Sequence, residues 1–305
     1  MIKAMFKQYG YTDKQIEKIL ESYIFRDRGE EFIINWLKEK FEFFSSVGYT
    51  KSQILKMTVV YPSLFTYGID NFVKKIEFLK SLGYADEEVI KITCSAPQVY
   101  GHSVDSIMQK IEEIESLGYK REQVLKIMLL SPSLFASGVN TIKQKFNDLE
   151  TLGYTKEEVL KITNFFPNLY GVSIDNIKGK MDVIQSLGYS KEEVLKLILG
   201  LPTLLGYSNE HLKEKFSFFI KMGLRDVPLS RPRNLMQSVD LTYARFRFLT
   251  EERNKEISMK TVSSLFAGSN LFQKTYKISK DELLARYSYD LDVRSKNKKR
   301  LLDQK

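Results

Sequence analysis

Apolar residues recur along this chain at helical spacing, in short segments separated by glycine and proline. In one such segment they stand three or four positions apart, at Ile177, Met181, Ile184 and Leu187. This spacing places them on one face of an α-helix and, repeated along the chain, predicts an all-α protein with more than about 60% helix and essentially no strand. We expect Leu187 and, in the next such segment, Phe216 to be buried between units.

Glycine and proline punctuate the chain with a fixed period. Glycine recurs every 35 residues, at Gly48, Gly83, Gly118, Gly153, Gly188 and Gly223. Proline follows fourteen residues after each of the first five, at Pro62, Pro97, Pro132, Pro167 and Pro202. A fixed period with fixed internal punctuation predicts a solenoid, in which each unit buries its apolar face against its neighbours.

Each unit carries the signals of two short helices. Thr155 stands three residues before Glu158, which is the arrangement of a capping box, and Ser190 with Glu193 repeats it. Pro167 predicts the end of the first helix after about eleven residues. A serine after a compact apolar turn opens the second helix, and the glycine of the next unit closes it.

The repeat extends past the strict period at both ends. The first unit is three residues longer, and the last matches the others if its first helix is five residues shorter. We count seven units in a single domain, 1–290, beginning near residues 10, 48, 83, 118, 153, 188 and 223, with a helical cap at 254–290. The basic stretch 291–305 lacks apolar periodicity and is interpreted as a disordered tail.

The segment LGYSKEEVLKLILGLPTLLGYSNEHLKEKFSFF resembles the motif of the mitochondrial transcription termination factor (mTERF) family. The resemblance covers roughly Phe6 to Tyr289 and includes a closing pattern, ARFRFLTEERNKEISMKTVSSLF followed by SKDELLARY. The first unit lacks the proline, and Gly68 and Gly138 replace the serine in two others. These departures weaken single turns but leave the resemblance intact.

The resemblance implies a curved superhelix with two α-helices and a short 3-10 turn in each unit. It also implies nucleic-acid binding along a basic groove, in transcription termination or initiation, organelle RNA processing or ribosome assembly. The family is not enzymatic, and its members act in mitochondria or plastids. No transit peptide is visible at the start of this sequence, so a bacterial cytoplasm is the alternative location.

Positive charge is concentrated in the last quarter of the chain. The formal net charge is +9, yet lysine and arginine number 29 against 28 acidic residues before Arg225, and 18 against 10 from there on. This asymmetry suggests a polyanionic partner, although a solvated basic tail explains part of it.

Two columns of lysine follow the period. One lies opposite the apolar face of the first helices and reads as a solvated face, at Lys56, Lys91, Lys126, Lys161 and Lys196. The other stands one residue before the apolar stripe of the second helices, at Lys40, Lys75, Lys110, Lys145, Lys180 and Lys215, and continues into Arg245. We expect the second column to form a positive ridge on the concave side that follows a phosphate backbone. Aliphatic stems that cover the helix seam are the alternative.

Arginine is dense in the last unit, and its guanidinium group suits bidentate contacts with phosphate or guanine. The candidates for nucleic-acid binding are Arg225, Arg231, Arg233, Arg245 and Arg247. Arg233 and Arg245 are the strongest of them. Some can instead pair with Asp226 or Asp240.

Signals of catalysis and of metal binding are absent from the sequence. Cys94 is the only cysteine, and His102 and His211 have no neighbouring ligand cluster. Glycine-rich phosphate loops, catalytic carboxylate pairs and nucleophile triads are missing, so we expect no enzyme, no cofactor and no metal. No apolar run approaches the roughly 18 residues of a membrane span, and we expect a soluble protein without a membrane partner.

These observations favour a monomeric nucleic-acid-binding protein that binds double-stranded DNA and regulates transcription. Binding of structured or ribosomal RNA shares every candidate residue with this hypothesis. A scaffold whose groove holds a protein partner is the alternative of another class, and the near-neutral charge before Arg225 favours it.

Overall fold

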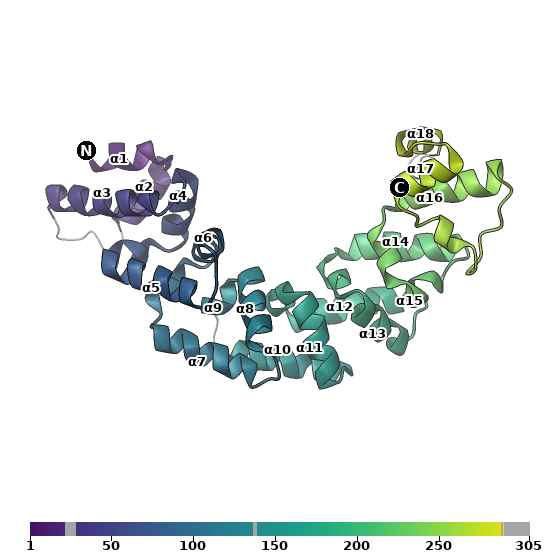
Figure 1. Cartoon of the computed structure of the whole chain (residues 1–305), viewed down its shortest axis with the longest axis horizontal. Coiled ribbons are helices and arrows are strands. Elements are labelled where there is room, and N and C mark those ends of the chain that lie inside the picture. Colours follow the sequence, from purple (N-terminus) through teal and green to yellow (C-terminus); the bar gives the residue numbers. More distant parts are fainter. Residues whose placement is uncertain (22–28, 137–138, 288, 290–305) are drawn as a thin grey trace, which may run out of the picture. The chain divides into compact units, whose positions relative to one another are not determined.

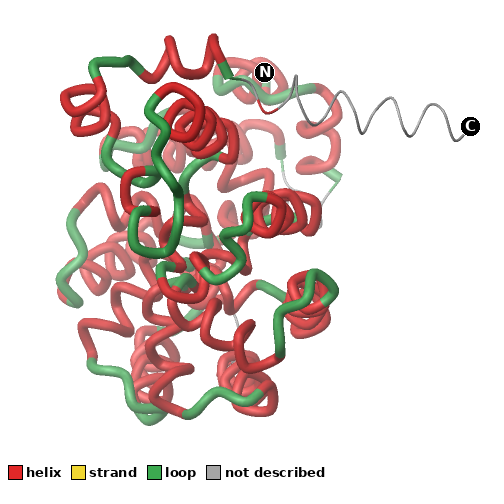
Figure 2. Tube along the Cα trace, turned by 90° about the vertical axis from the view of Figure 1, so that its right-hand side faces the viewer, coloured by secondary structure: helices red, strands yellow, loops and turns green. Residues whose placement is uncertain are grey.

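The computed structural model describes the chain except for residues 22–28, 137–138, 288 and 290–305, so the stretch interpreted as a disordered tail lies outside the described residues. Helices make up 76% of the structure, and the described residues form no strand (Figure 2). The prediction of an all-α helical-repeat protein is therefore confirmed. The chain divides into two compact bodies, here named the N-terminal body, Met1–Thr151, and the C-terminal body, Leu152–Lys305.

In the N-terminal body, the α-helices and 3-10 turns (η) follow the predicted order of the repeat. They are α1 (Ile2–Gln8), α2 (Asp13–Leu20), α3 (Glu30–Ser46), α4 (Lys51–Val60), η2 (Pro62–Thr66), α5 (Ile69–Ser81), α6 (Asp86–Ser95), η3 (Pro97–Gly101), α7 (Val104–Glu115), α8 (Arg121–Leu130), α9 (Ser133–Ala136) and α10 (Val139–Leu152), which ends at the boundary between the bodies.

The C-terminal body continues the same order and ends in shorter helices. Its elements are α11 (Lys156–Phe165), η4 (Pro167–Gly171), α12 (Ile174–Gln185), α13 (Lys191–Gly200), η5 (Pro202–Gly206), α14 (Asn209–Lys221), α15 (Val227–Ser230), η6 (Pro232–Met236), α16 (Val239–Arg247), the π-helical turn η7 (Phe248–Glu252), η8 (Val262–Ser264), α17 (Ser269–Tyr276) and α18 (Lys280–Arg286).

Helices of the same kind pack against each other within each body. The first helices of successive units are in contact as α4, α6 and α8 in the N-terminal body, and as α11, α13 and α15 in the C-terminal body. The second helices α12, α14 and α16 form a parallel row in the C-terminal body (Figure 1). Each body thus has two layers of helices with the apolar stripes between them.

Local signals set the helix ends as the sequence predicts. The hydroxyls of Thr155 and Ser190 accept the backbone N–H of Glu158 and Glu193, and each glutamate accepts the N–H of its cap residue. In each complete 35-residue unit the proline starts a 3-10 turn, except in the unit that contains α9, where a short α-helix follows it. The glycine after each second helix takes a positive φ, for example +120° at Gly153, which a side chain rarely tolerates.

A buried tyrosine follows each of these glycines except Gly223, where buried Leu224 takes its place. Where a threonine faces it, the two hydroxyls form a hydrogen bond, as between Tyr49 and Thr93 at 2.6 Å. For Tyr84, the position equivalent to Thr93 is Met128, which has no hydroxyl. The hydroxyl of Tyr84 donates to the carbonyl of Leu125 instead, at 2.8 Å. Each buried phenol is therefore satisfied, whichever residue faces it.

The C-terminal cap repeats the pattern of the units, which the sequence analysis missed. Lys277 follows α17 with φ +59°, in the place of the periodic glycine, and buried Ile278 replaces the tyrosine. Ser279 then caps α18 by accepting the N–H of Glu282, as Ser190 does in α13. The likeness of SKDELL to SKEEVL was the available signal.

The predicted apolar stripe is buried along the helices but not beyond their ends. Phe216 is 0% exposed and Ile177 is 0% exposed, as predicted. The prediction for Leu187 is wrong, because this side chain is only half-buried. Leu187 comes after Ser186, the cap residue of α12, so it no longer follows the helical face. Among the described residues, no helix is long and apolar enough to cross a membrane.

The two stripe residues predict different losses of stability. Replacing Phe216 with alanine should lower the free energy of unfolding by about 3 to 5 kcal/mol, because the ring leaves a cavity. Leu187→Ala should cost less than about 1.5 kcal/mol, since part of the side chain already meets solvent. Urea denaturation of both variants measures the difference. Equal losses would contradict the assignment of Phe216 as buried and Leu187 as half-buried.

The buried tyrosines predict a loss of stability in alkali. Burial raises the pKa of Tyr49 to about 12, whereas an unfolded tyrosine ionises near pH 10. Between these values the native state keeps a proton that the unfolded state releases. The free energy of unfolding should therefore stay constant up to about pH 10 and fall above it. Urea denaturation across this range should give a shallower fall for Tyr49→Phe. Equal slopes for the variant and the parent would refute the prediction.

Candidate nucleic-acid interface

The second-helix lysine column lies inside the protein. The exposed fractions are 4% for Lys75, 8% for Lys110, 7% for Lys145, 8% for Lys180 and 4% for Lys215. These residues stand at the seam between successive units, one position before the apolar stripe. Burial lowers the pKa of Lys75, Lys110, Lys145 and Lys215, because the charged ammonium loses hydration.

The ammonium groups donate hydrogen bonds to backbone carbonyls of the next unit. Lys180 donates to the carbonyl of Tyr207 at 2.8 Å, and Lys215 to that of Gln237 at 2.9 Å. Lys75 bonds in the same way to His102, and Lys110 donates to Phe135 at 2.6 Å. Tyr207, Gln237 and His102 each stand directly before the cap residue of a second helix.

This geometry gives the column a structural role. The expectation that its ammonium groups form an exposed ridge is wrong, because their stems cross the helix seam and their charged ends lie under the next turn. The alternative of stems that cover the seam describes them correctly. Contact between these lysines and nucleic acid stays a prediction.

The first-helix lysine column has the opposite environment. All five of its members are exposed, as expected for a solvated face: Lys56, Lys91, Lys126, Lys161 and Lys196. The two columns therefore divide the periodic lysines into one buried set and one exposed set.

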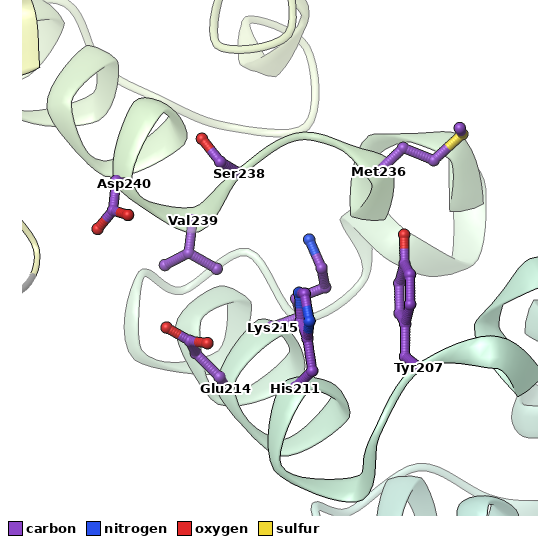
Figure 3. Close-up of a pocket in the computed structure, with 8 residues that line it drawn as sticks. All are labelled: Tyr207, His211, Glu214, Lys215, Met236, Ser238, Val239 and Asp240. Carbon is purple, nitrogen blue, oxygen red and sulfur yellow. The ribbon is translucent and has the colours of Figure 1, made fainter. Parts of the chain in front are cut away.

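A hollow of about 300 Å³ lies beside Lys215, between α14 and the start of α16 (Figure 3). The rings of Tyr207 and His211 stack at its edge, with centroids 4.8 Å apart and planes 9° apart. Glu214 and Asp240 lie across the hollow from these rings. Its wall is therefore aromatic on one side and acidic on the other, with the ammonium of Lys215 beneath.

Arg225 is half-buried and forms ion pairs with two acidic residues of its own body. Its guanidinium bonds to Glu193 at 2.6 Å and to Asp226 at 2.9 Å, and it donates to the carbonyl of Gly188 at 2.7 Å. The hydrogen bond with Glu193, followed by that with Asp226, raises its pKa. The expected pairing with Asp226 is confirmed, and the side chain links the start of α13 to the following unit.

Arg245 is 1% exposed and continues the lysine column inside the core. Its guanidinium donates to the carbonyls of Leu265 and Ala267 at 2.9 and 2.6 Å and lies over the ring of Phe272. Ala267 directly precedes Gly268, the cap residue of α17. The expectation that Arg245 is one of the two strongest candidates for nucleic-acid contact conflicts with this burial, because the seam that buries the lysines also buries its guanidinium.

Arg247 is half-buried and paired at the end of α16. It forms an ion pair with Glu251 and donates to the hydroxyl of Tyr243 at 2.6 Å. The hydrogen bond with Glu251 is the main cause of its raised pKa. Any polyanion that takes this guanidinium has to compete with Glu251.

Arg231 and Arg233 are the two candidates that remain available. Both are exposed, and neither guanidinium has a hydrogen-bond or ion-pair partner among the described residues. They flank Pro232, which starts η6 and packs closely against Gly200 on α13. Lys196, four residues before Gly200, lies on the same face of α13 and is exposed. The sequence carries no signal that connects this lysine with the two arginines, because its spacing indicates only a solvated face for Lys196.

Comparison with protein families gives a match to the mTERF model over residues 2–267. The chain belongs to the mTERF family. Members of the mTERF family are helical-repeat proteins that bind nucleic acid, and they are generally not enzymes. No curated protein matches the chain.

Metal-binding clusters and reactive thiols are two features that bear on catalysis in this mTERF protein. Its described residues contain no group of three histidine, cysteine, aspartate or glutamate side chains that could hold a metal ion. Cys94 is buried, and burial raises the pKa of its thiol to about 11, so the reactive thiolate is scarce at neutral pH.

The structural role of the lysine column can be tested on one helix. Lys180→Met keeps most of the stem but leaves the carbonyl of Tyr207 without its donor, so the free energy of unfolding should fall by about 1 to 3 kcal/mol. Lys178→Met, on the exposed face of α12, should change it by less than about 0.5 kcal/mol. Chemical denaturation compares the two. A Lys180 variant of parental stability that binds nucleic acid weakly would assign the column to the ligand instead.

Proposed function

We propose that this mTERF protein binds double-stranded DNA and regulates transcription, with Arg231 and Arg233 as principal contacts. The observation that carries the proposal is the state of these two side chains. They are exposed and lack partners among the described residues, while Arg225, Arg245 and Arg247 are engaged within the protein.

The chemistry of the two guanidinium groups supports a phosphate or guanine ligand. Each can donate two parallel hydrogen bonds to one phosphate or to the edge of one guanine. An exposed arginine without a partner loses no internal ion pair when it binds. Pro232, between the two arginines, packs against Gly200, so the pair lies beside the C-terminal end of α13.

The other basic candidates enter the proposal in a secondary role. The buried lysines and Arg245 hold the units in register, and Arg225 and Arg247 reach an external anion only in competition with their acidic partners. We propose organelle gene expression, in a mitochondrion or plastid, as the process, on the basis of family membership. Structured RNA is the alternative ligand.

A protein-binding scaffold is the second candidate function. It is favoured by the balance of 29 basic and 28 acidic residues before Arg225. Most of the array therefore has almost no net positive charge to attract a polyanion. The exposed arginine pair and the charge excess after it favour nucleic acid.

The arginine pair makes the proposal testable. Arg231→Ala with Arg233→Ala should weaken duplex binding by about 2 kcal/mol or more, roughly thirtyfold, because two charge-assisted contacts are lost. The slope of log affinity against log salt should fall by about 0.9 for each phosphate contact removed. Titrations of the parent and variant against duplex DNA, single-stranded RNA and structured RNA, each at several salt concentrations, measure both effects.

Two control variants separate the contact from its charge. Lys14→Ala with Lys18→Ala removes the same charge from the exposed surface of α2 and should leave affinity nearly unchanged. Replacing both arginines with lysine should recover the salt slope but only part of the affinity. If the alanine pair binds duplex and both RNAs as the parent does, the arginine-centred interface is wrong and the scaffold hypothesis gains.

A further inference from the structure

The N-terminal body contains a hollow of about 510 Å³ between α5 and the start of α7. By the period of the repeat it is equivalent to the hollow in Figure 3, although its chemistry differs. Lys74 stands where the other hollow has Glu214, whereas Asp105 and Asp240 stand at equivalent positions in both. His102 also lines this hollow. One carboxylate of the Figure 3 hollow is thus replaced by an ammonium here.

Several hydrogen-bond donors meet in this hollow. Lys74 and Asn71 are exposed on α5, and neither side chain has a hydrogen-bond or ion-pair partner among the described residues. The ammonium of Lys75 lies in its wall, 4% exposed, and donates to the carbonyl of His102. An ammonium has three N–H groups, so two remain beyond that bond. The first turn of α7, capped by Ser103, adds backbone N–H groups without acceptors in the helix.

The imidazole of His102 reports the positive potential of the hollow. Its pKa is lowered, first by burial and then by the charges of Lys110 on α7 and Lys75 on α5. The free protein therefore keeps His102 neutral at physiological pH. Asp105, in the first turn of α7, also lines the hollow and opposes an anion.

We propose that this hollow binds one phosphate group, held by Lys74, His102 and the start of α7. The proposal rests on the proposed function where the phosphate belongs to a nucleic-acid backbone, and a free phosphate offers the same chemistry. The hollow of Figure 3 does not share this ligand, because Glu214 stands there in place of Lys74 and would repel an anion.

Phosphate binding here is coupled to a proton. A bound anion offsets the charges of Lys110 and Lys75 that lower the pKa of His102, so it raises that pKa toward or above the ordinary value. Between the free and bound values, binding takes up a proton on His102, and the affinity rises as the pH falls. Asp105 is the acidic group in the wall of the hollow.

Histidine NMR tests the hollow without any nucleic acid. The chain has two histidines, so His102→Gln assigns both signals. Inorganic phosphate should raise the pKa of His102 relative to sodium chloride at equal ionic strength, and should leave that of His211 in place. Lys74→Ala should reduce the shift, and Asp105→Asn should increase it. A His102 that responds equally to phosphate and chloride overturns the proposal.

Binding assays then decide the source of the phosphate. Lys74→Ala should weaken nucleic-acid binding about fivefold, as expected for an exposed charge pair, and should lower the salt slope by about 0.9 for a duplex or 0.7 for a single strand. Lys91→Ala, at an exposed position of α6 in the same body, is the matched control and should do neither. The pH dependence of binding should weaken in His102→Gln.

The outcomes distinguish this proposal from the proposed function. If Lys74→Ala keeps the salt slope of the parent while nucleic-acid affinity still depends on Arg231 and Arg233, Lys74 does not contact the backbone. The proposed function then stands. A His102 response to inorganic phosphate in a protein that binds no nucleic acid supports a free-phosphate site and refutes the proposed function.

Discussion

The hydrogen bond from a buried cation of one unit to a backbone carbonyl of the next is the interaction on which the array depends. That carbonyl lies between the turn and the second helix, where regular structure supplies no donor. Lys180 and Lys215 reach it across the seam with long stems, and Arg245 uses its larger fork for the final seam. The cation and the carbonyl are both buried, so the loss of one leaves the other without a hydrogen-bond partner. This cost favours a single spacing between successive second helices.

The environment of each cation, more than the total charge, decides what it can do. Cations at the seam satisfy carbonyls, and Arg225 and Arg247 neutralise carboxylates of their own body. Only side chains outside these networks can meet an external anion without first breaking an internal bond. In the C-terminal body the pair Arg231 and Arg233 meets this condition, and in the N-terminal body Lys74 does. Two sparse contacts of this kind are compatible with a nearly neutral array.

Caps, turns and the unit period could be predicted from sequence because each depends on residues within a few positions of one another. Ser190 and Glu193 are an example, since both partners of the capping box lie in one turn of helix. The fate of Lys180 could not be predicted in this way, because its acceptor lies 27 residues ahead on another unit. A position one residue before an apolar stripe can face solvent or the seam. Only the packed neighbour decides between them, and the same holds for Arg245.

The short helix α15, Val227–Ser230, has a consequence for how such a chain can change its length. Lys215 reaches its acceptor over 22 residues and Lys180 over 27, yet both bond to the residue before a second-helix cap. The five missing residues were therefore removed from the first helix without disturbing the seam. Deletions and insertions should be tolerated in first helices, and excluded from the segment between the proline and the seam cation. The array can thus vary its layer of first helices while it keeps the spacing of its second helices.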